Sequence, residues 1–340
     1  MRIRLLGVAA TAAALLPLGI TVAGPASAAS GGGHARYTVL AGDDGFLIYA
    51  EAISHSPLDP ASLDPKADIF ALGRTGKPVL LGKVLSNEEV VSLSRSNVVI
   101  VNTFKHKKRL RAWNLDSGRH TDIATNEDVV GATPNGWIAT DPGFVDGTHV
   151  VARSYAGDLI DYGTPITPGV DYGVTVGPNG FVAYANNFVD DNGEVTYTPW
   201  AHPDRHRTLL EPGGKNVRCD SVSADYAGCV IRGGINRSVT LIALSGEHRT
   251  TAGNRCAYHV AVWGRRLAWS VGISSHGCKS GHVGATSNAG LSRLSKQRFN
   301  ILGMATAWGW VVMSSAGQRS LVKISAIRHK AKPLNRANVS

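Results

Sequence analysis

Residues 135–140 read NGWIAT, a two-residue turn followed by a short apolar run, and variants of this phrase recur along the chain. Similar phrases are DGFLIY at 44–49, NGFVAYA at 179–185 and WGWVVM at 308–313. Glycine and asparagine favour tight turns because they tolerate positive φ. A short apolar run without polar alternation is typical of a strand that is buried on both faces. The repetition therefore indicates that one structural unit is built several times.

The spacing of the phrase is regular. Consecutive anchors, taken as the first apolar residue after each turn, lie 38 to 52 residues apart with a mean of 44. A weaker strand precedes each anchor, and alternating runs such as RLRAWNLDSG at 109–118 predict a third strand after several of them. No segment shows sustained helical periodicity, so we expect an all-β chain. The anchors are Phe46, Val98, Trp137, Phe181, Cys229, Leu267 and Trp310.

This period and pattern resemble those of the β-propeller superfamily, with WD-repeat-like blades, in its secreted bacterial, lectin-like or adaptor-like form. A blade of four strands takes about 40–45 residues. The resemblance implies a seven-bladed β-propeller over residues 37–334, after a flexible N-terminus at 29–36 and before a tail at 335–340. The paired Gly-His and Trp-Asp signature is missing, so the resemblance is one of architecture. Either the strand near Tyr37 or the basic C-terminal tail could complete the last blade.

The N-terminus predicts export. Arg2 and Arg4 precede an apolar run from Leu5 to Leu18, and Ala26-Ser27-Ala28 forms a small-x-small cleavage pattern. These features are typical of a secretory signal peptide, here residues 1–28. A membrane anchor is disfavoured because the run is shorter than the ~20 residues that a span needs. We expect a secreted, extracellular protein with no membrane span.

The charge balance bears on partners. The formal net charge of the 340 residues is +10. A basic protein is attracted to anionic surfaces, which outside a bacterial cell are wall polymers, lipids and acidic glycans. We therefore expect an extracellular glycan, a wall polymer or a secreted partner protein, and no nucleic acid.

Four cysteines follow the predicted signal peptide. An even number in an exported protein favours disulfides. Three pairings are possible, and proximity favours Cys219–Cys229 and Cys256–Cys278, each joining neighbouring strands of one repeat. The alternative is four buried thiols.

Catalytic and metal-binding motifs are scarce. The sequence contains no G-x-S-x-G, H-E-x-x-H or P-loop motif. His276, Cys278 and His282 have spacings that zinc could use, but Cys278 is the expected partner of Cys256. We expect neither metal nor cofactor, and no catalytic residues. A glycosidase would need two carboxyls about 5–10 Å apart. Candidates for such a pair are Glu51, Asp141, Asp158, Asp161 and Asp171.

A basic stretch, KHKKRLR at 105–111, is the clearest candidate for binding. It falls between the second and third strands of the second repeat, on the rim that propellers use most for ligands. Equivalent connections elsewhere add two arginines, and Trp200 lies in an irregular stretch where an aromatic ring could be exposed. The alternatives to ligand binding are a solvated turn for the basic stretch and, for Trp200, packing against the next blade. The candidate ligand residues are Lys105, Lys107, Lys108, Arg109, Arg232, Arg237 and Trp200.

Three functions fit these observations. The favoured one is a non-enzymatic binding protein for a cell-surface glycan, an anionic wall polymer or a partner protein, possibly within a secreted complex. The others are a polysaccharide hydrolase or lyase with its site at the central funnel, and a scaffold. Carboxylates and histidines gathered at the channel mouth would favour the enzyme. A basic or aromatic rim around an inert channel would favour binding.

Overall fold

The computed structural model consists of strands and turns, and the part of the chain that it describes contains no helix. The described residues are 34–43, 45–54, 67–84, 90–104, 107–144, 147–163, 171–186, 194–211, 216–233, 236–247, 249–253, 257–264, 266–271, 284–287, 290–293, 301–308, 310–315, 322–325 and 331–333. The predicted signal peptide and C-terminal tail lie outside them. None of the described segments is a helix long and apolar enough to cross a membrane.

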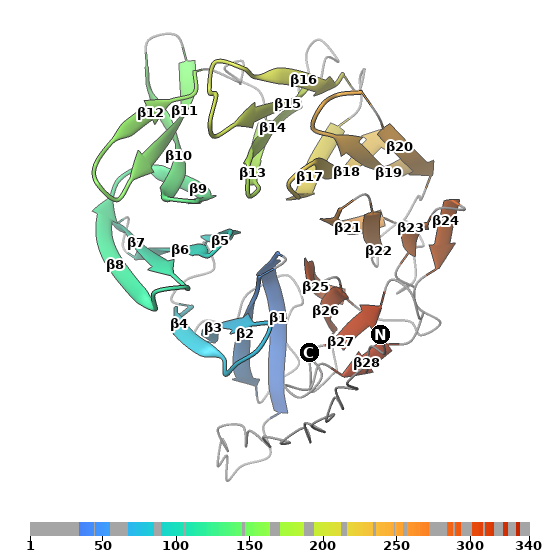
Figure 1. Ribbon diagram of the computed structural model, residues 1–340, viewed down its shortest axis with the longest axis horizontal. Coiled ribbons are helices and arrows are strands. Elements are labelled where there is room, and N and C mark those ends of the chain that lie inside the picture. Colours follow the sequence, from blue (N-terminus) through green and yellow to red (C-terminus); the bar gives the residue numbers. More distant parts are fainter. Residues whose placement is uncertain are drawn as a thin grey trace, which may run out of the picture.

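The strands form seven four-stranded antiparallel sheets, arranged as a ring (Figure 1). Within each sheet, strands that are consecutive in sequence are neighbours, so every sheet is a simple meander. The first strand of each sheet lies nearest the axis and the fourth lies at the periphery (Figure 1). The fold is therefore a β-propeller, as the resemblance implied.

The strand bounds are as follows. The first three sheets contain β1 (His34–Gly42), β2 (Phe46–Ser54), β3 (Asp68–Gly73), β4 (Val79–Lys83), β5 (Val90–Ser94), β6 (Asn97–Phe104), β7 (Lys107–Asn114), β8 (Arg119–Thr125), β9 (Asp128–Thr133), β10 (Gly136–Phe144), β11 (Gly147–Ser154) and β12 (Leu159–Asp161). The next two contain β13 (Asp171–Val176), β14 (Gly180–Asn186), β15 (Glu194–Pro199), β16 (Arg207–Leu210), β17 (Asn216–Val222), β18 (Tyr226–Gly233), β19 (Asn236–Ala243) and β20 (Arg249–Gly253). The last two contain β21 (Ala257–Trp263), β22 (Arg266–Val271), β23 (Gly284–Ser287), β24 (Gly290–Arg293), β25 (Ile301–Ala307), β26 (Trp310–Ser315), β27 (Val322–Ser325) and β28 (Ala331–Pro333).

The prediction of a seven-bladed propeller needs correction, because the structure has five complete blades. These are the five sheets from β1–β4 to β17–β20, in which side chains are described in all four strands. In the sixth and seventh sheets the outer strands have only three or four residues and are described by their backbone alone. The β23 strand is joined to β22 through just two described residue pairs. The repeated phrase misled because its anchors all lie in second strands, which say nothing about how far the outer strands extend.

The second strands show why the phrase is apolar. Val98 and Ile100 of β6 are buried in the core between the first and second blades. Val99 and Val101, which alternate with them, are buried in the core between the second and third blades. Successive side chains of a strand point to opposite faces. A second strand that packs on a neighbouring blade at each face is therefore apolar at successive positions along its buried middle.

The ring closes without a sheet shared by the two ends of the described chain, because β1–β4 and β25–β28 are separate sheets. The Val39 N–H donates to Ser314 Oγ (3.1 Å), and Trp308 Nε1–H donates to the Gly45 carbonyl (3.0 Å). The last sheet is completed by β28, which comes from the basic stretch near the C-terminus, and not by the N-terminal strand near Tyr37. The apolar core of this junction contains Val39, Leu47, Tyr49, Leu72, Ala305, Ala307, Trp308 and Val312.

One predicted disulfide is present. Cys219 and Cys229 face each other across β17 and β18, both sulfurs are bonded, and both residues are buried. This bond is compatible with an extracellular protein. Cys256 and Cys278 lie outside the described residues, so their pairing stays a prediction.

Candidate functional site

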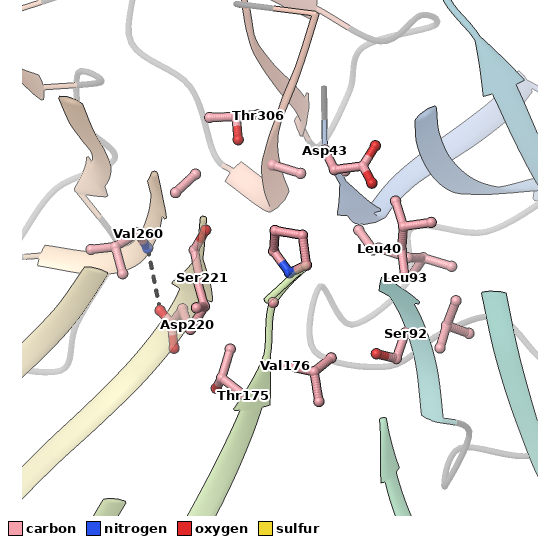
Figure 2. Close-up of a pocket in the computed structure, with 18 of the residues that line it drawn as sticks. Leu40, Asp43, Ser92, Leu93, Thr175, Val176, Asp220, Ser221, Val260 and Thr306 are labelled. Atoms are coloured by element: carbon pink, nitrogen blue, oxygen red, sulfur yellow. Dashed lines mark hydrogen bonds between the residues drawn. The ribbon is translucent and has the colours of Figure 1, made fainter. Parts of the chain in front are cut away.

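The first strands of the sheets enclose a cavity of about 200 Å³ around the ring axis, here called the axial cavity (Figure 2). Its lining is mainly aliphatic, with Leu40, Leu93 and Val176 facing inward from three different sheets. Hydroxyl groups are interspersed among them. The charged residues at this lining are Asp43, Arg95 and Asp220.

The hydroxyls of the axial cavity connect neighbouring sheets. First strands of adjacent sheets share no ladder, so their buried backbone groups need side-chain partners. Each hydroxyl therefore forms a hydrogen bond with a backbone group of the adjacent sheet. Ser92 Oγ accepts from the Ala132 N–H (3.0 Å), Thr175 Oγ1 donates to the Cys219 carbonyl (2.5 Å), Ser221 Oγ accepts from the Val262 N–H (3.1 Å), and Thr306 Oγ1 donates to the Val262 carbonyl (2.9 Å).

The two carboxylates of the axial cavity are also engaged. Asp220 pairs with Arg218 (2.6 and 3.0 Å) and accepts from the Val260 N–H (3.2 Å), the contact drawn in Figure 2. Asp43 accepts from two backbone N–H groups of its own turn. No histidine lines the cavity among the described residues. In the same part of the chain no three His, Cys, Asp or Glu side chains gather as a metal site would require.

A different kind of depression lies between the first and second blades. This basic groove, of about 540 Å³, is lined by Leu81, Gly82, Lys83, Ile100, Asn102, Arg109, Leu110, Arg111, Asp122, Ile123 and Ala124. Leu81, Ile100 and Leu110 are buried and form its apolar floor. The cations project from β4 and β7, the outer part of two adjacent sheets.

The charges of the basic groove are only partly balanced. Arg111 holds Asp122 through two hydrogen bonds of 2.6 and 2.8 Å. This pairing raises the pKa of Arg111 and lowers the pKa of Asp122. Lys83 Nζ lies 3.7 Å from Asp68 Oδ1, and its side chain is 64% exposed, so that pair is loose.

Arg109 is exposed, and the described residues give it no ion-pair partner within 4.0 Å. Its charge acts on Asp122 at longer range, where it helps to lower that pKa. Asn102, opposite Arg109 across β6 and β7, has a buried amide oxygen that no described donor reaches. The groove thus keeps positive charge that the fold does not use.

The predicted lysines divide between the two faces of β7. Lys108 pairs with Asp128 of the third blade, and its side chain is only 26% exposed. It therefore lies on the face opposite Arg109, so the structure does not bring these two predicted ligand residues together. Lys107 begins β7, but its side chain is not among those described, and Lys105 lies outside the described residues altogether.

Arg232 and Arg237 face each other across β18 and β19 and are both half-buried. Arg237 Nη1–H donates to the Ala257 carbonyl (3.0 Å), and Arg232 also interacts within the molecule. They belong to the fifth blade, whereas Arg109 on β7 belongs to the second, so the third and fourth blades lie between them. The structure does not bring them together with Arg109 into one basic face.

Trp200 is half-buried in the turn after β15. Its indole N–H donates to the Gly177 carbonyl (3.2 Å), and its ring lies 5.5 Å from Phe181 and 5.9 Å from Tyr162, centroid to centroid. These contacts support packing between blades.

Lys83 and Asn102 escaped sequence analysis as groove residues, whereas Arg111 lies within the predicted basic stretch at 105–111. Lys83 ends a fourth strand, whereas Arg109 belongs to the third strand of the next blade. No local pattern joins two such positions. The period of the repeat could have pointed to them, but only with knowledge of how adjacent blades pack.

No protein-family model matches the chain, and no curated protein matches it in sequence. Solved structures resemble it in fold. The β-propeller domain of the Trilobed protease from Pyrococcus furiosus, described as having an open velcro topology, aligns with a TM-score of 0.59 and 8% identity over 90% of this chain and 99% of its own. An oligogalacturonate lyase in complex with manganese aligns with a TM-score of 0.53 and 9% identity over 86% of this chain and 89% of its own.

A prolyl endopeptidase aligns with a TM-score of 0.60 and 11% identity over 88% of this chain and 48% of its own. This chain therefore spans about half the length of that peptidase. At such low identities the likeness shows the propeller fold alone.

Proposed function

We propose that this chain is a secreted, non-enzymatic binding protein that holds an anionic extracellular polymer, an acidic glycan or a wall polymer, in the basic groove. The observation that carries the proposal is Arg109, an exposed guanidinium with no described carboxylate partner, beside Lys83 and above an apolar floor. Export rests on the N-terminal sequence pattern and agrees with the Cys219–Cys229 bond.

The chemistry of the groove suits such a ligand. A guanidinium offers a planar pair of donors that fits carboxylate and phosphate groups, and Lys83 adds a mobile point charge. The half-buried Ile123 and the exposed Ala124 offer a small surface for the apolar face of a sugar ring. A volume of about 540 Å³ can hold a short stretch of polymer.

The enzymatic alternative has less support. A lyase or glycosidase at the funnel needs acidic groups that are free to act on the substrate. Asp43 and Asp220 of the axial cavity are instead held by backbone N–H groups and by Arg218. The likeness to an oligogalacturonate lyase lies in the fold, and it adds an acidic sugar to the ligands worth testing.

The test compares two double variants with the same loss of charge. Arg109→Gln with Lys83→Gln neutralises the groove, and Arg74→Gln with Lys77→Gln neutralises the exposed turn between β3 and β4 of the first blade. Retention is measured on purified bacterial cell walls and on immobilised polygalacturonate, from 0.05 to 1 M salt. The groove variant should lose most of its retention and the control little.

Retention of the wild type should also fall steeply with salt, because the screening length shrinks from about 10 Å at 0.1 M to about 3 Å at 1 M. Equal loss in both variants would mean that net charge alone drives binding. The appearance of shortened polymer fragments during incubation would favour the enzyme.

A further inference from the structure

A second open depression lies between the fourth and fifth blades. This tyrosine groove, of about 510 Å³, is lined by Tyr197, Arg207, Ala224, Asp225, Tyr226, Ala243, Leu244, Ser245 and Gly264. Asp225 belongs to the turn between β17 and β18, and Ser245 to the turn between β19 and β20. Because antiparallel strands alternate in direction, these turns lie on the rim opposite the turn between β6 and β7. The tyrosine groove is therefore separate from the basic groove.

The floor of the tyrosine groove is fixed. Tyr197 is buried, and its hydroxyl donates to the Asn179 carbonyl (3.2 Å). Tyr226 is half-buried and packs against the core shared by the fifth and sixth sheets. Leu244 is buried in the same core as Tyr197, and its N–H donates to the Asp225 carbonyl (2.8 Å). A floor of rings and aliphatic carbon is thus already in place.

Two exposed charges of opposite sign border this floor. Arg207 makes one long contact, from Nη1 to the Ser245 carbonyl (3.5 Å), and the described residues show no ion pair between Arg207 and Asp225. Both charges act electrostatically on Tyr197. Burial raises the pKa of Tyr197, while Arg207 lowers it and Asp225 raises it further. A donor and an acceptor therefore face the same floor without satisfying each other.

We infer that the tyrosine groove binds a neutral saccharide. A sugar ring has an apolar face of C–H groups that packs on tyrosine, and its hydroxyls both donate and accept hydrogen bonds. One ring can therefore donate to the Asp225 carboxylate and accept from the Arg207 guanidinium. The opposite charges cancel, so the groove offers no net attraction to a polyanion. Its small flanking residues, Ala224, Ala243 and Gly264, leave room for the ring.

A zwitterionic peptide is the competing ligand, since its ammonium and carboxylate groups could reach the same two charges. It would be held by charge, and its binding would weaken with salt. Hydrogen bonds from neutral hydroxyls to charged groups depend little on salt and still contribute to affinity. Salt dependence therefore separates the two ligands.

The probes are cellohexaose, mannohexaose and chitohexaose, with the tetrapeptide Lys-Ala-Ala-Glu as the competing class. Binding is followed by calorimetry and by ligand-observed NMR at 0.05 and 0.5 M salt. At least one hexasaccharide should bind with an affinity that salt leaves nearly unchanged. Arg207→Gln and Asp225→Asn should each weaken it about tenfold or more, because each removes a hydrogen bond to a charged group.

Arg249→Gln, which removes an exposed cation on β20 of the fifth blade, is the matched control and should bind like the wild type. The Arg109→Gln, Lys83→Gln variant should also keep saccharide binding, which separates this site from the basic groove. Binding of the peptide alone, binding of none of the three hexasaccharides, or saccharide affinity unchanged by both groove substitutions would overturn the inference.

Discussion

The axial cavity and the basic groove both contain polar side chains but use them differently. Around the axis, the hydroxyls of Ser221 and Thr306 and the carboxylate of Asp220 each hold a backbone group of a neighbouring sheet. In the basic groove, Arg109 holds nothing in the described structure, and Lys83 holds Asp68 only loosely. In this propeller a polar group near the centre is explained by the ring itself, and unmatched charge is found between blades.

The difference has a physical origin. Buried backbone groups at the axis must be satisfied, because an unpaired buried donor costs about 1–3 kcal/mol. Exposed charges between blades carry no such requirement, since a surface ion pair contributes only about 0–1 kcal/mol. Substitutions at the axis should therefore change stability, and substitutions in the groove should change binding.

The largest expected effect is on the disulfide beside the axial strands. Replacing both Cys219 and Cys229 with alanine should lower the free energy of unfolding by about 3 kcal/mol, the chain-entropy value for a loop of this size. The loop spans a sequence separation of 10. Urea denaturation monitored by circular dichroism measures it. Binding to polyanions by the folded variant should stay unchanged, and an unaltered midpoint would contradict the expectation.

The hydroxyls around Val262 provide the next effect. Ser221→Ala leaves the Val262 N–H without its side-chain acceptor, and Thr306→Val leaves the Val262 carbonyl without its donor. Each should cost about 1–3 kcal/mol of unfolding free energy. Thr250→Ala on the exposed face of β20 is the control and should change stability by less than about 0.5 kcal/mol. Equal midpoints for all three variants would show that the axis tolerates unpaired groups.

Asp122 tests the groove from the other side. Asp122→Asn removes the partner of Arg111 and adds one unmatched guanidinium to the basic groove. Retention on polygalacturonate should rise a few-fold, while stability should fall by no more than about 1 kcal/mol, as for an exposed ion pair. Asp116→Asn, an exposed carboxylate in the turn between β7 and β8, is the matched control. Weaker or unchanged retention for Asp122→Asn would separate the groove from the binding site.

The smallest effect concerns pH. The hydrogen bond from Arg111 lowers the pKa of Asp122 in the folded protein. A lowered carboxyl pKa stabilises the fold above its unfolded value, about 3.9, and this contribution is lost as the pH falls through the folded value. The stability difference between the wild type and Asp122→Asn should thus be constant from about pH 5 to 8, where the carboxyl stays ionised. It should shrink below about pH 4, where the carboxyl becomes protonated. A difference that grows at acidic pH would refute this assignment.

The sequence predicted what repeats and missed what depends on neighbouring blades. The anchors from Phe46 to Trp310 located the second strand of each sheet, because a strand packed on both faces is largely apolar. Cys219 and Cys229 were paired correctly since their strands are adjacent in the meander. The lengths of β23, β24, β27 and β28 carried no such signal.

The candidate sites were harder to predict. Arg109 was found because it lies in a dense basic run, but its companion Lys83 comes from another blade. Lys108, from the same basic run, instead pairs with Asp128 of the third blade. Because side chains alternate along a strand, Lys108 lies on the face of β7 opposite Arg109. Charge density along the chain therefore located the strand, and only the packing of blades decided which charges remain unmatched.

The way in which the ring closes also bears on how such a chain can be rewired. Every sheet is a continuous segment, and β1 packs beside β25 through side chains and hydrogen bonds, without sharing a ladder. The junction between the last and first sheets is thus of the same kind as the others. A circular permutant that starts at β5 and links β28 to β1 would keep every ladder intact. In such an architecture, the fold does not depend on which sheet is translated first.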